Sequence, residues 1–341
     1  MGLTAEQLAG AVVPDPDRVL AASATCADWL DAAAAASVLS GLAAAADPAG
    51  ALNALRRLLD EVAPPLSGAE VVALLRLLGG SPALAVALAA EGTSWPAALR
   101  GVLAEERRDA MAHRRALKAL GVAGALARDT LQARLRLYRR RELLRVGGRD
   151  LLGLASVDDT MRELSALADA VIDAATASTR TRLAEEWKSD APVAFVVLGM
   201  GKLGGGELNY SSDVDLVYVY GRDGDHPGGR TLREFFVRIG EEVTRALAEV
   251  TADGFCFRVD LRLRPGGGEG PLAVSLPALL SYYEAYGQTW ERAVWLKARA
   301  VGGDLALGNA ITGELTPFMY RRFLDFGMLE ELKAMKRRVD A

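Results

Sequence analysis

The stretch VAFVVLGMGKLGGGELNYSSDVDLVYVY, residues 193–220, decides the fold of this 341-residue chain. Its first six residues are apolar and run directly into glycines, which is typical of a buried strand that ends in a tight turn. A second strand is predicted at 213–220, where two aspartates are followed by apolar, strand-forming residues. Two strands joined by a glycine-rich turn predict a sheet in this part of the chain.

The aspartates of the second strand, Asp213 and Asp215, are expected to project from one face, because side chains at i and i+2 of a strand point the same way. The apolar residues around them place the pair at the start of a buried strand. Two such carboxylates repel each other unless a cation neutralises them. Hard oxygen ligands of this kind suit Mg²⁺, with Mn²⁺ as the alternative ion.

A third strand is predicted at 255–263, where apolar residues alternate with Arg258, Asp260 and Arg262. If this strand lies beside the second, with an intervening helix crossing over, Asp260 joins the same carboxylate cluster and can activate an attacking oxygen. The alternative is a half-exposed strand whose charged residues pair with one another across the surface.

The glycine-rich turn at 199–206 lies just before the aspartate pair, and glycines permit close approach of the backbone to phosphate oxygens. It has neither the Walker sequence nor the Rossmann spacing, so alone it is a weak signal. Ser211 and Ser212 orient an aspartate or a phosphate, or else form a strand-entry turn. The residues expected to bind phosphate are Gly201, Lys202, Gly204, Gly205, Ser211, Ser212, Arg258, Arg262 and Arg264.

Helical spacing surrounds the predicted sheet, which indicates an α+β fold. A helix at 232–247 is marked by a capping box of Thr231 and Glu234, and another near 160–175 by Thr160 and Glu163. We expect a helical N-terminal region at 1–190, a mixed-sheet core at 191–272 and a helical C-terminal segment at 273–341.

The composition indicates a globular protein with 51% hydrophobic residues and a formal charge of −4, which leaves no excess of cations for nucleic acid or a membrane surface. The longest run of small apolar residues, 32–46, is too short to span a bilayer. The N-terminus does not resemble a signal peptide, so a cytoplasmic location is expected. Cys26 and Cys256 are too few for a disulfide framework, and both are expected to be buried thiols.

A basic run, residues 134–149, contains seven arginines in an acidic chain. Most such runs are solvated helix faces. The alternative is a surface that faces a nucleotide or an acidic partner, since arginine forks suit phosphate and carboxylate equally.

Three long motifs occur in order: GMGKLGG at 199–205, ELNYSSDVDL at 207–216 and FRVDLRLRP at 257–265. With shorter segments such as KAR at 297–299, they resemble the bifunctional glutamine synthetase adenylyltransferase and adenylyl-removing enzyme family over about residues 130–341. The resemblance implies a nucleotidyltransferase fold, similar to that of DNA polymerase β. It also implies that Asp213, Asp215 and Asp260 are the catalytic, metal-holding residues.

Enzymes of that family carry two nucleotidyltransferase domains, one that removes AMP from a tyrosine of glutamine synthetase and one that adds it. This chain has room for one, and the sequence Asn209 to Asp213 resembles the N-terminal, adenylyl-removing copy. The resemblance therefore implies phosphorolysis of adenylylated glutamine synthetase, with orthophosphate consumed, ADP released and regulation by a PII-type signal protein. The chain stops at Ala341 within a charged helical pattern, so a longer polypeptide is expected.

Two alternatives remain open at this point. The same carboxylates would serve ATP-dependent adenylylation of glutamine synthetase, because the phosphoryl chemistry is the same in both directions. A non-catalytic regulatory or docking module of such an enzyme is the other. Lys297, Arg299 and Asp304 are expected either to close over the site or to form a salt-bridge network in packed helices.

Overall fold

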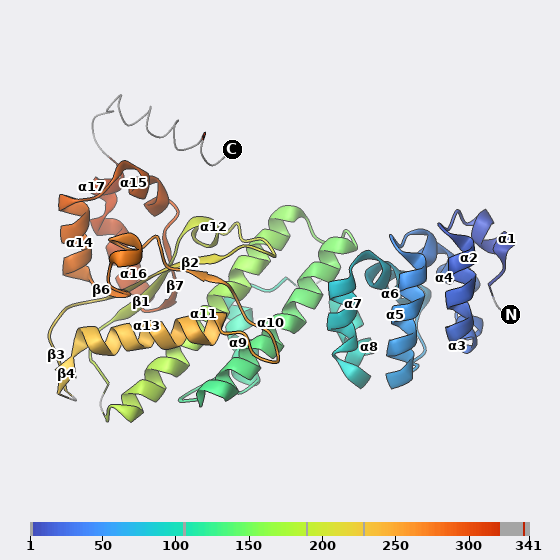
Figure 1. Cartoon of the computed structure of the whole chain (residues 1–341), viewed down its shortest axis with the longest axis horizontal. Helices are drawn as coiled ribbons and strands as arrows, with labels where there is room; N and C mark the ends of the chain where they lie inside the picture. Colours follow the sequence, from blue (N-terminus) through green and yellow to red (C-terminus); the bar gives the residue numbers. More distant parts are fainter. Residues whose placement is uncertain (1–2, 105–106, 189, 228, 321–336, 338–341) are drawn as a thin grey trace. The chain divides into compact units, whose positions relative to one another are not determined.

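The computed structural model of the chain describes residues 3–104, 107–188, 190–227, 229–320 and 337. It divides into two compact units, one made of residues 1–107 and 140–160 and the other of residues 108–139 and 161–341. Helices α10 (Arg128–Leu151) and α11 (Val157–Glu186) contribute residues to both units (Figure 1).

The first unit is built of short helices, several of which begin at a side-chain cap. Ser67 and Glu70 form a capping box, and Ser81 caps the next helix, which has a proline in its first turn. Leucines such as Leu42, Leu55 and Leu74 are fully buried between them. The helices are α1 (Ala5–Gly10), α2 (Pro16–Ser23), α3 (Ala27–Ala32), α4 (Ala35–Ala43), α5 (Pro48–Glu61), α6 (Gly68–Gly80), α7 (Pro82–Ala89) and α8 (Trp95–Leu103).

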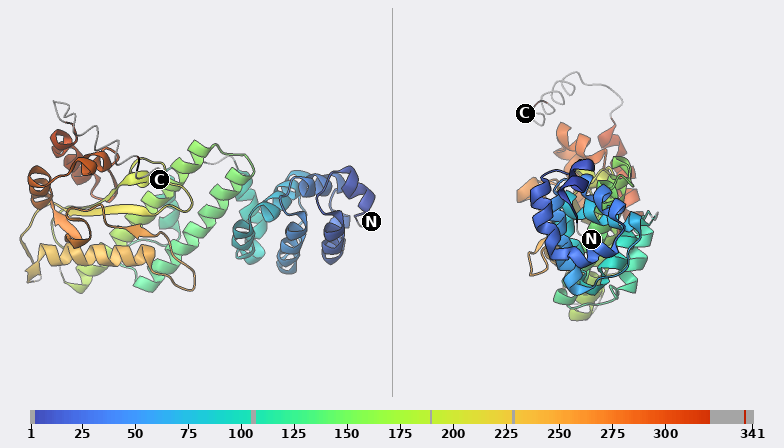
Figure 2. Two further views of the ribbon diagram at one scale, coloured as in Figure 1. Left: turned by 45° about the horizontal axis from the view of Figure 1, so that its top comes forward. Right: turned by 90° about the vertical axis from the view of Figure 1, so that its right-hand side faces the viewer.

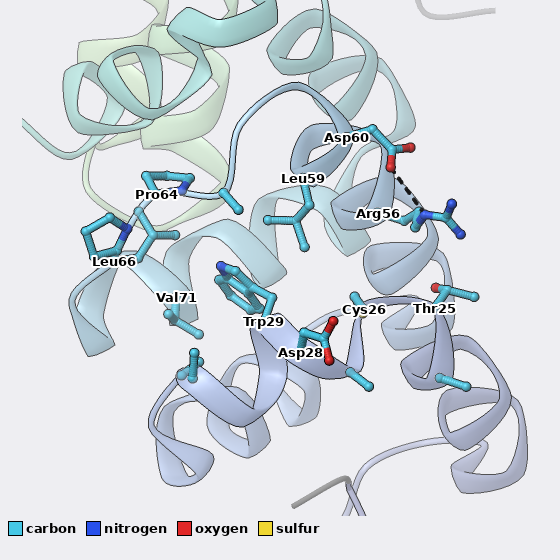
Figure 3. Close-up of a pocket in the computed structure, with 16 residues that line it drawn as sticks. Thr25, Cys26, Asp28, Trp29, Arg56, Leu59, Asp60, Pro64, Leu66 and Val71 are labelled. Carbon is cyan, nitrogen blue, oxygen red and sulfur yellow. Dashed lines mark hydrogen bonds and ion pairs between the residues drawn. The ribbon is translucent and has the colours of Figure 1, made fainter.

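A cavity of about 720 Å³ opens in the first unit, between α3, α5 and the segment that leads into α6 (Figure 3). Trp29, Leu59 and Leu66 supply apolar wall, and Arg56 pairs with Asp60 at 3.5 Å on its border. None of the residues predicted to bind metal or phosphate lines this cavity.

In the described part of the chain no single helix has the length and apolar character to cross a membrane. Helices α6 and α7 meet the requirements of length and apolar composition only when they are taken together, and they are bent by 119° at the break between them.

The second unit contains a five-stranded mixed sheet, which confirms the predicted α+β class. β1 lies between β2 and β7 and is antiparallel to both. β5 pairs in parallel with the start of β2, and β6 pairs in parallel with its end. The strands are β1 (Phe195–Gly199), β2 (Val214–Tyr220), β5 (Val259–Asp260), β6 (Ala273–Ser275) and β7 (Arg299–Gly303), with a separate hairpin of β3 (Asp225–His226) and β4 (Arg230–Thr231).

Helices cover both faces of this sheet. Helix α13 (Leu232–Ala248) runs along it in Figure 1 and in the left-hand view of Figure 2, and its Phe236 stacks on Phe195 and Tyr220. The opposite side chains, including Val196 and Val219, pack against the C-terminal helices. These are α14 (Leu276–Ala285), α15 (Thr289–Trp295), α16 (Leu305–Glu314) and α17 (Thr316–Met319), while α9 (Ala110–Ala119) belongs to the N-terminal part of this unit.

Two strand predictions need correction. The predicted strand at 255–263 is reduced to Val259–Asp260, because the backbone amides of Cys256 and Phe257 donate to the carbonyl of Leu247 at the end of α13. The segment at 273–341, predicted to be helical, contributes β6 and β7 to the sheet. β7 ends in two glycines that pack closely against α11 and β1, and helical periodicity gives no sign of such a strand. Most of the predicted segment beyond residue 320 lies outside the described residues.

One of the two predicted capping boxes is confirmed and the other is not. The capping box of Thr231 and Glu234 is confirmed at the start of α13. Thr160 lies inside α11, which begins one turn earlier, where the Ser156 hydroxyl accepts the amide of Asp159 at 3.2 Å. Cys26 and Cys256 are buried free thiols, as predicted.

The basic run at 134–149 is not a solvated face. Arg136, Arg145 and Arg149 are all buried. Arg136 donates to the carbonyl of Gly254 at 2.7 Å, and Arg149 donates to carbonyls in its own unit. Arg145 pairs with the buried carboxylate of Glu142 at 2.8 Å. Bonds to backbone carbonyls and to this carboxylate explain the burial of the three arginines without a ligand.

Candidate functional site

The carboxylate cluster forms at the point where β5 meets the start of β2. Asp215 and Asp260 occupy paired positions of the two parallel strands, and Asp213 immediately precedes β2. The amide of Val214 donates to the carbonyl of Arg258 at 2.9 Å and fixes this register. Because paired residues of neighbouring strands share a face, the crossover of α13 places Asp260 beside Asp215.

The three carboxylates are not in equivalent electrostatic environments. Burial raises the pKa of the Asp215 carboxyl, and the negative charges of Asp260 and Asp213 raise it further. Hydrogen bonds from Arg262 lower the pKa of Asp260. Neighbouring groups therefore neutralise the negative charge of Asp215 only in part.

Two arginines face the outer carboxylates. The Nε of Arg258 donates to Asp213 Oδ1 at 2.5 Å, and the same guanidinium bonds the carbonyl of Ser211. The Nε and Nη2 of Arg262 contact Asp260 Oδ2 at 2.9 and 2.5 Å. Both arginine side chains are exposed, Arg262 by 82%, so these pairs are weak enough to exchange for a ligand.

The glycine-rich turn contains a single helical turn, α12 (Gly201–Gly204), that lies against Asp215. The amide of Met200 donates to the carbonyl of Asp215 at 2.9 Å. Gly201 has φ +54°, and a Cβ there would lie 2.5 Å from Asp215 Oδ2. Only glycine therefore allows the turn to approach the carboxylate this closely.

Lys202 and Ser212 lie across the entrance to β2. The Nζ of Lys202 is 3.5 Å from the hydroxyl of Ser212, and that hydroxyl donates to Asn209 Oδ1. The backbone carbonyl of Ser211 accepts a hydrogen bond from Arg258, and Ser211 is exposed. The structure thus gathers Gly201, Lys202, Ser211, Ser212, Arg258 and Arg262 around the three aspartates.

Three other predicted phosphate ligands are engaged elsewhere. Gly204 is buried, and a side chain there would collide with the carbonyl of Lys297. The amide of Gly205 donates to the carbonyl of Gly201 at 3.1 Å. Arg264 donates to the carbonyls of Leu261, Gly268 and Gly270, so its guanidinium closes its own loop.

The three carboxylates are chemically suitable ligands for a metal ion, but their side chains are not arranged to hold one. Among the described residues, no group of three or more His, Cys, Asp or Glu side chains is arranged to hold an ion. Asp213 and Asp260 face arginines instead. Three carboxylates with surplus negative charge at Asp215 nevertheless suit a hard divalent cation, which would displace the exposed arginines.

Sequence reasoning missed the support beneath the turn. Arg299 was expected in a helical segment, but it begins β7 and reaches Asp169 on α11. Asp304 caps α16 through the amide of Leu307, and Lys297 pairs with Glu207 at 2.6 Å. The role of Arg299 could have been predicted only if residues 299–303 had been recognised as a strand next to β1.

Comparison with known proteins gives a consistent result. The family model for glutamate-ammonia ligase adenylyltransferase matches residues 71–313. The chain is 48% identical over 218 residues to a bifunctional glutamine synthetase adenylyltransferase/adenylyl-removing enzyme of Pseudomonas aeruginosa, which covers 61% of this chain and 22% of the relative. Similar proteins with the same description occur in Thioalkalivibrio sulfidiphilus, at 45% identity over 63% of this chain and 22% of the relative, and in Shewanella loihica, at 42% identity over 63% and 23%. The matched part of the chain spans about a fifth of the length of these relatives.

Proposed function

The chain belongs to the glutamate-ammonia ligase adenylyltransferase family, and on this premise we propose that it removes AMP from an adenylylated tyrosine of glutamine synthetase by phosphorolysis. The observation that carries the proposal is the pairing of Asp215 with Asp260 beside Asp213, next to a glycine turn and exposed cations. We assign the sheet of the second unit to a nucleotidyltransferase fold similar to that of DNA polymerase β. The direction of transfer is supported by the sequence Asn209 to Asp213, which resembles the adenylyl-removing copy.

In the proposed reaction an oxygen of orthophosphate attacks the phosphorus of the AMP-tyrosine diester. The bond from phosphorus to the tyrosyl oxygen breaks, ADP is released, and the phenolate takes up a proton. The difficulty is that an anionic nucleophile approaches an anionic diester. Arg258, Arg262 and Lys202 are the exposed cations placed to hold the incoming phosphate.

The proposed cofactor is Mg²⁺, or Mn²⁺, held by Asp213, Asp215 and Asp260. When bound, it would screen the phosphate charges and stabilise the leaving oxygen. The chain's own contribution is to present the carboxylates on adjacent strand positions and to keep the turn against Asp215. A PII-type signal protein as regulator and the cytoplasm as location belong to the same proposal.

The test uses the purified chain with Mg²⁺, orthophosphate and adenylylated glutamine synthetase, and measures ADP formed and AMP lost from the synthetase. A parallel reaction contains ATP and unmodified synthetase. ADP formation in the first reaction, abolished in Asp215→Asn, is the expected result. Product in the ATP reaction alone would establish the adding direction, and an unchanged rate in Asp213→Asn and Asp215→Asn would remove the catalytic role.

A further inference from the structure

Helix α11 presents three hydrogen-bonding side chains, Ser165, Asp169 and Asp173, toward the edge of the sheet and the loops of the site. Their spacing of four residues puts them on one face of the helix. The hydroxyl of Ser165 accepts the amide of Leu208 at 3.0 Å. Asp173 accepts the amide of Gly303 at 3.0 Å. One helix face thus holds the segment after the glycine-rich turn and the end of β7.

Between these two contacts, Asp169 binds Arg299, and Arg299 binds the turn itself. The guanidinium nitrogens Nη1 and Nη2 donate to the two oxygens of Asp169 at 2.5 and 3.0 Å. Nη2 also donates to the carbonyl of Leu203 at 2.9 Å, and Nε donates to that of Gly204 at 3.2 Å. A single side chain therefore joins α11 to the last two carbonyls of α12. Lysine could not reproduce this fork.

This pair differs from the exposed ion pairs of the site. The side chain of Asp169 is only 9% exposed. Burial raises the pKa of its carboxyl, while the hydrogen bonds and charge of Arg299 act in the opposite direction. A buried carboxylate is costly unless a partner neutralises it, so the charge of Asp169 requires Arg299 and the two side chains are held in one arrangement.

The two ends of α12 are consequently fixed in different ways. Its beginning is held by β2, because the amide of Met200 donates to the carbonyl of Asp215, and Gly201 lies close to the carboxylate of that residue. Its end is held by Arg299. We propose that Asp169 and Arg299 are positioning residues, which set the distance of Gly201 and Lys202 from the carboxylates by clamping the far end of the turn. This inference rests on the proposed function, since it assigns the turn to phosphate binding.

The first experiment measures hydrogen exchange of the amides in residues 199–208 by mass spectrometry of the intact chain. Arg299→Lys and Asp169→Asn are compared with Arg114→Lys. Arg114 makes a matched control because it pairs with Asp173 on the same helix at 2.8 Å, and its other hydrogen bond in the described part of the chain is to the sulfur of Met111 rather than to the turn. We expect exchange in 199–208 to rise about tenfold in the two clamp variants and to remain unchanged in the control.

The second experiment measures steady-state kinetics of the same variants. The KM for orthophosphate should rise about tenfold, whereas the KM for adenylylated glutamine synthetase should stay near that of the wild type. A merely structural role would change both constants and would speed exchange in β2 as well. Asp169→Asn keeps the test open if Arg299→Lys fails to fold.

Unchanged exchange in 199–208, or faster exchange spread over the whole sheet, would overturn the clamp. A wild-type chain without activity in either direction would instead remove the proposed function. The exchange result would then still decide whether Asp169 and Arg299 hold the turn.

Discussion

Asp215 and Asp260 are paired residues of two parallel strands, although the whole of α13 separates them in the sequence. The pairing places one carboxylate in a partly buried position with a raised pKa and the other beside a guanidinium with a lowered pKa. Such an arrangement is costly in the absence of a cation, because the charges of Asp213 and Asp260 act on Asp215. Strain of this kind is expected at a functional site rather than in a structural ion pair.

Asp215→Asn should therefore stabilise the chain while abolishing its activity. The substitution removes a buried charge and the repulsion by Asp213 and Asp260, so the thermal midpoint should rise in EDTA. Adenylyl-removing activity should fall at least about 10³-fold, because the central carboxylate is lost. Calorimetry and the ADP assay measure the two effects, and a variant that is less stable in EDTA would contradict this account of the cluster.

The sequence predicted the carboxylate cluster because strand periodicity is local. Alternation assigned Asp213 and Asp215 to one face. Two further assumptions, a strand through Asp260 and the crossover of α13, were needed to bring Asp260 beside them. The turn was likewise visible as a run of glycines. Its contact with Asp215 depends on the φ angle of Gly201, which composition does not reveal.

The support of the site was not predictable in the same way. β7 ends in two glycines, and Arg299 finds its carboxylate on α11, far away in the sequence. The buried arginines of 134–149 show the same limit, since Arg136 and Arg149 bind backbone carbonyls, which leave no mark in the sequence. Periodicity identifies which face of an element is apolar, whereas the partner of a buried charge is set by tertiary contacts.

Gly201→Ala tests the close approach of the turn to Asp215. The added Cβ meets Asp215 Oδ2, and the left-handed backbone disfavours alanine, so we expect a loss of about 1–2 kcal/mol in the free energy of unfolding. Because the turn or the carboxylate must move, activity should fall about 10²-fold. Urea unfolding and initial rates measure these changes.

Gly254→Ala is the matched control for this substitution. Gly254 also has a left-handed backbone, at φ +80°, but a Cβ there would meet nothing within 4 Å. It should lose about 1 kcal/mol from backbone strain alone and keep the activity of the wild type. Equal activity losses in the two variants would show that the contact with Asp215 is unimportant.

Arg262→Gln should separate phosphate binding from metal binding. Without the guanidinium, the KM for orthophosphate should rise about tenfold, since a charge-assisted contact is lost. Asp260 becomes free to bind a cation, so Mg²⁺ should bind more tightly in the absence of phosphate, as measured by titration calorimetry. Weaker Mg²⁺ binding in the variant would contradict the view that Arg262 occupies the place of the cation.

Glu242→Gln addresses stability rather than catalysis. The side chain of Glu242 is 1% exposed and bonds Arg128, Arg182, Arg238 and Arg245. Its loss leaves four arginines without their shared carboxylate, and we expect a cost of roughly 2–3 kcal/mol at pH 7. Glu241→Gln is the control, because Glu241 is 45% exposed and pairs only with Arg238 within the described part of the chain, so its cost should stay below about 0.5 kcal/mol.

The effect of Glu242→Gln should also depend on pH in a defined direction. Burial by itself would raise the pKa of Glu242, but hydrogen bonds and charges from the arginines outweigh it and lower the pKa below its usual 4.5. The carboxylate therefore contributes its full stability above about pH 5, and this contribution is lost as the pH falls through the lowered pKa. The difference in unfolding free energy between wild type and variant should be constant from pH 7 to about pH 5 and shrink below that. A difference that grows toward acid pH would show that Glu242 is held in its protonated form and that the four arginines are not its partners in solution.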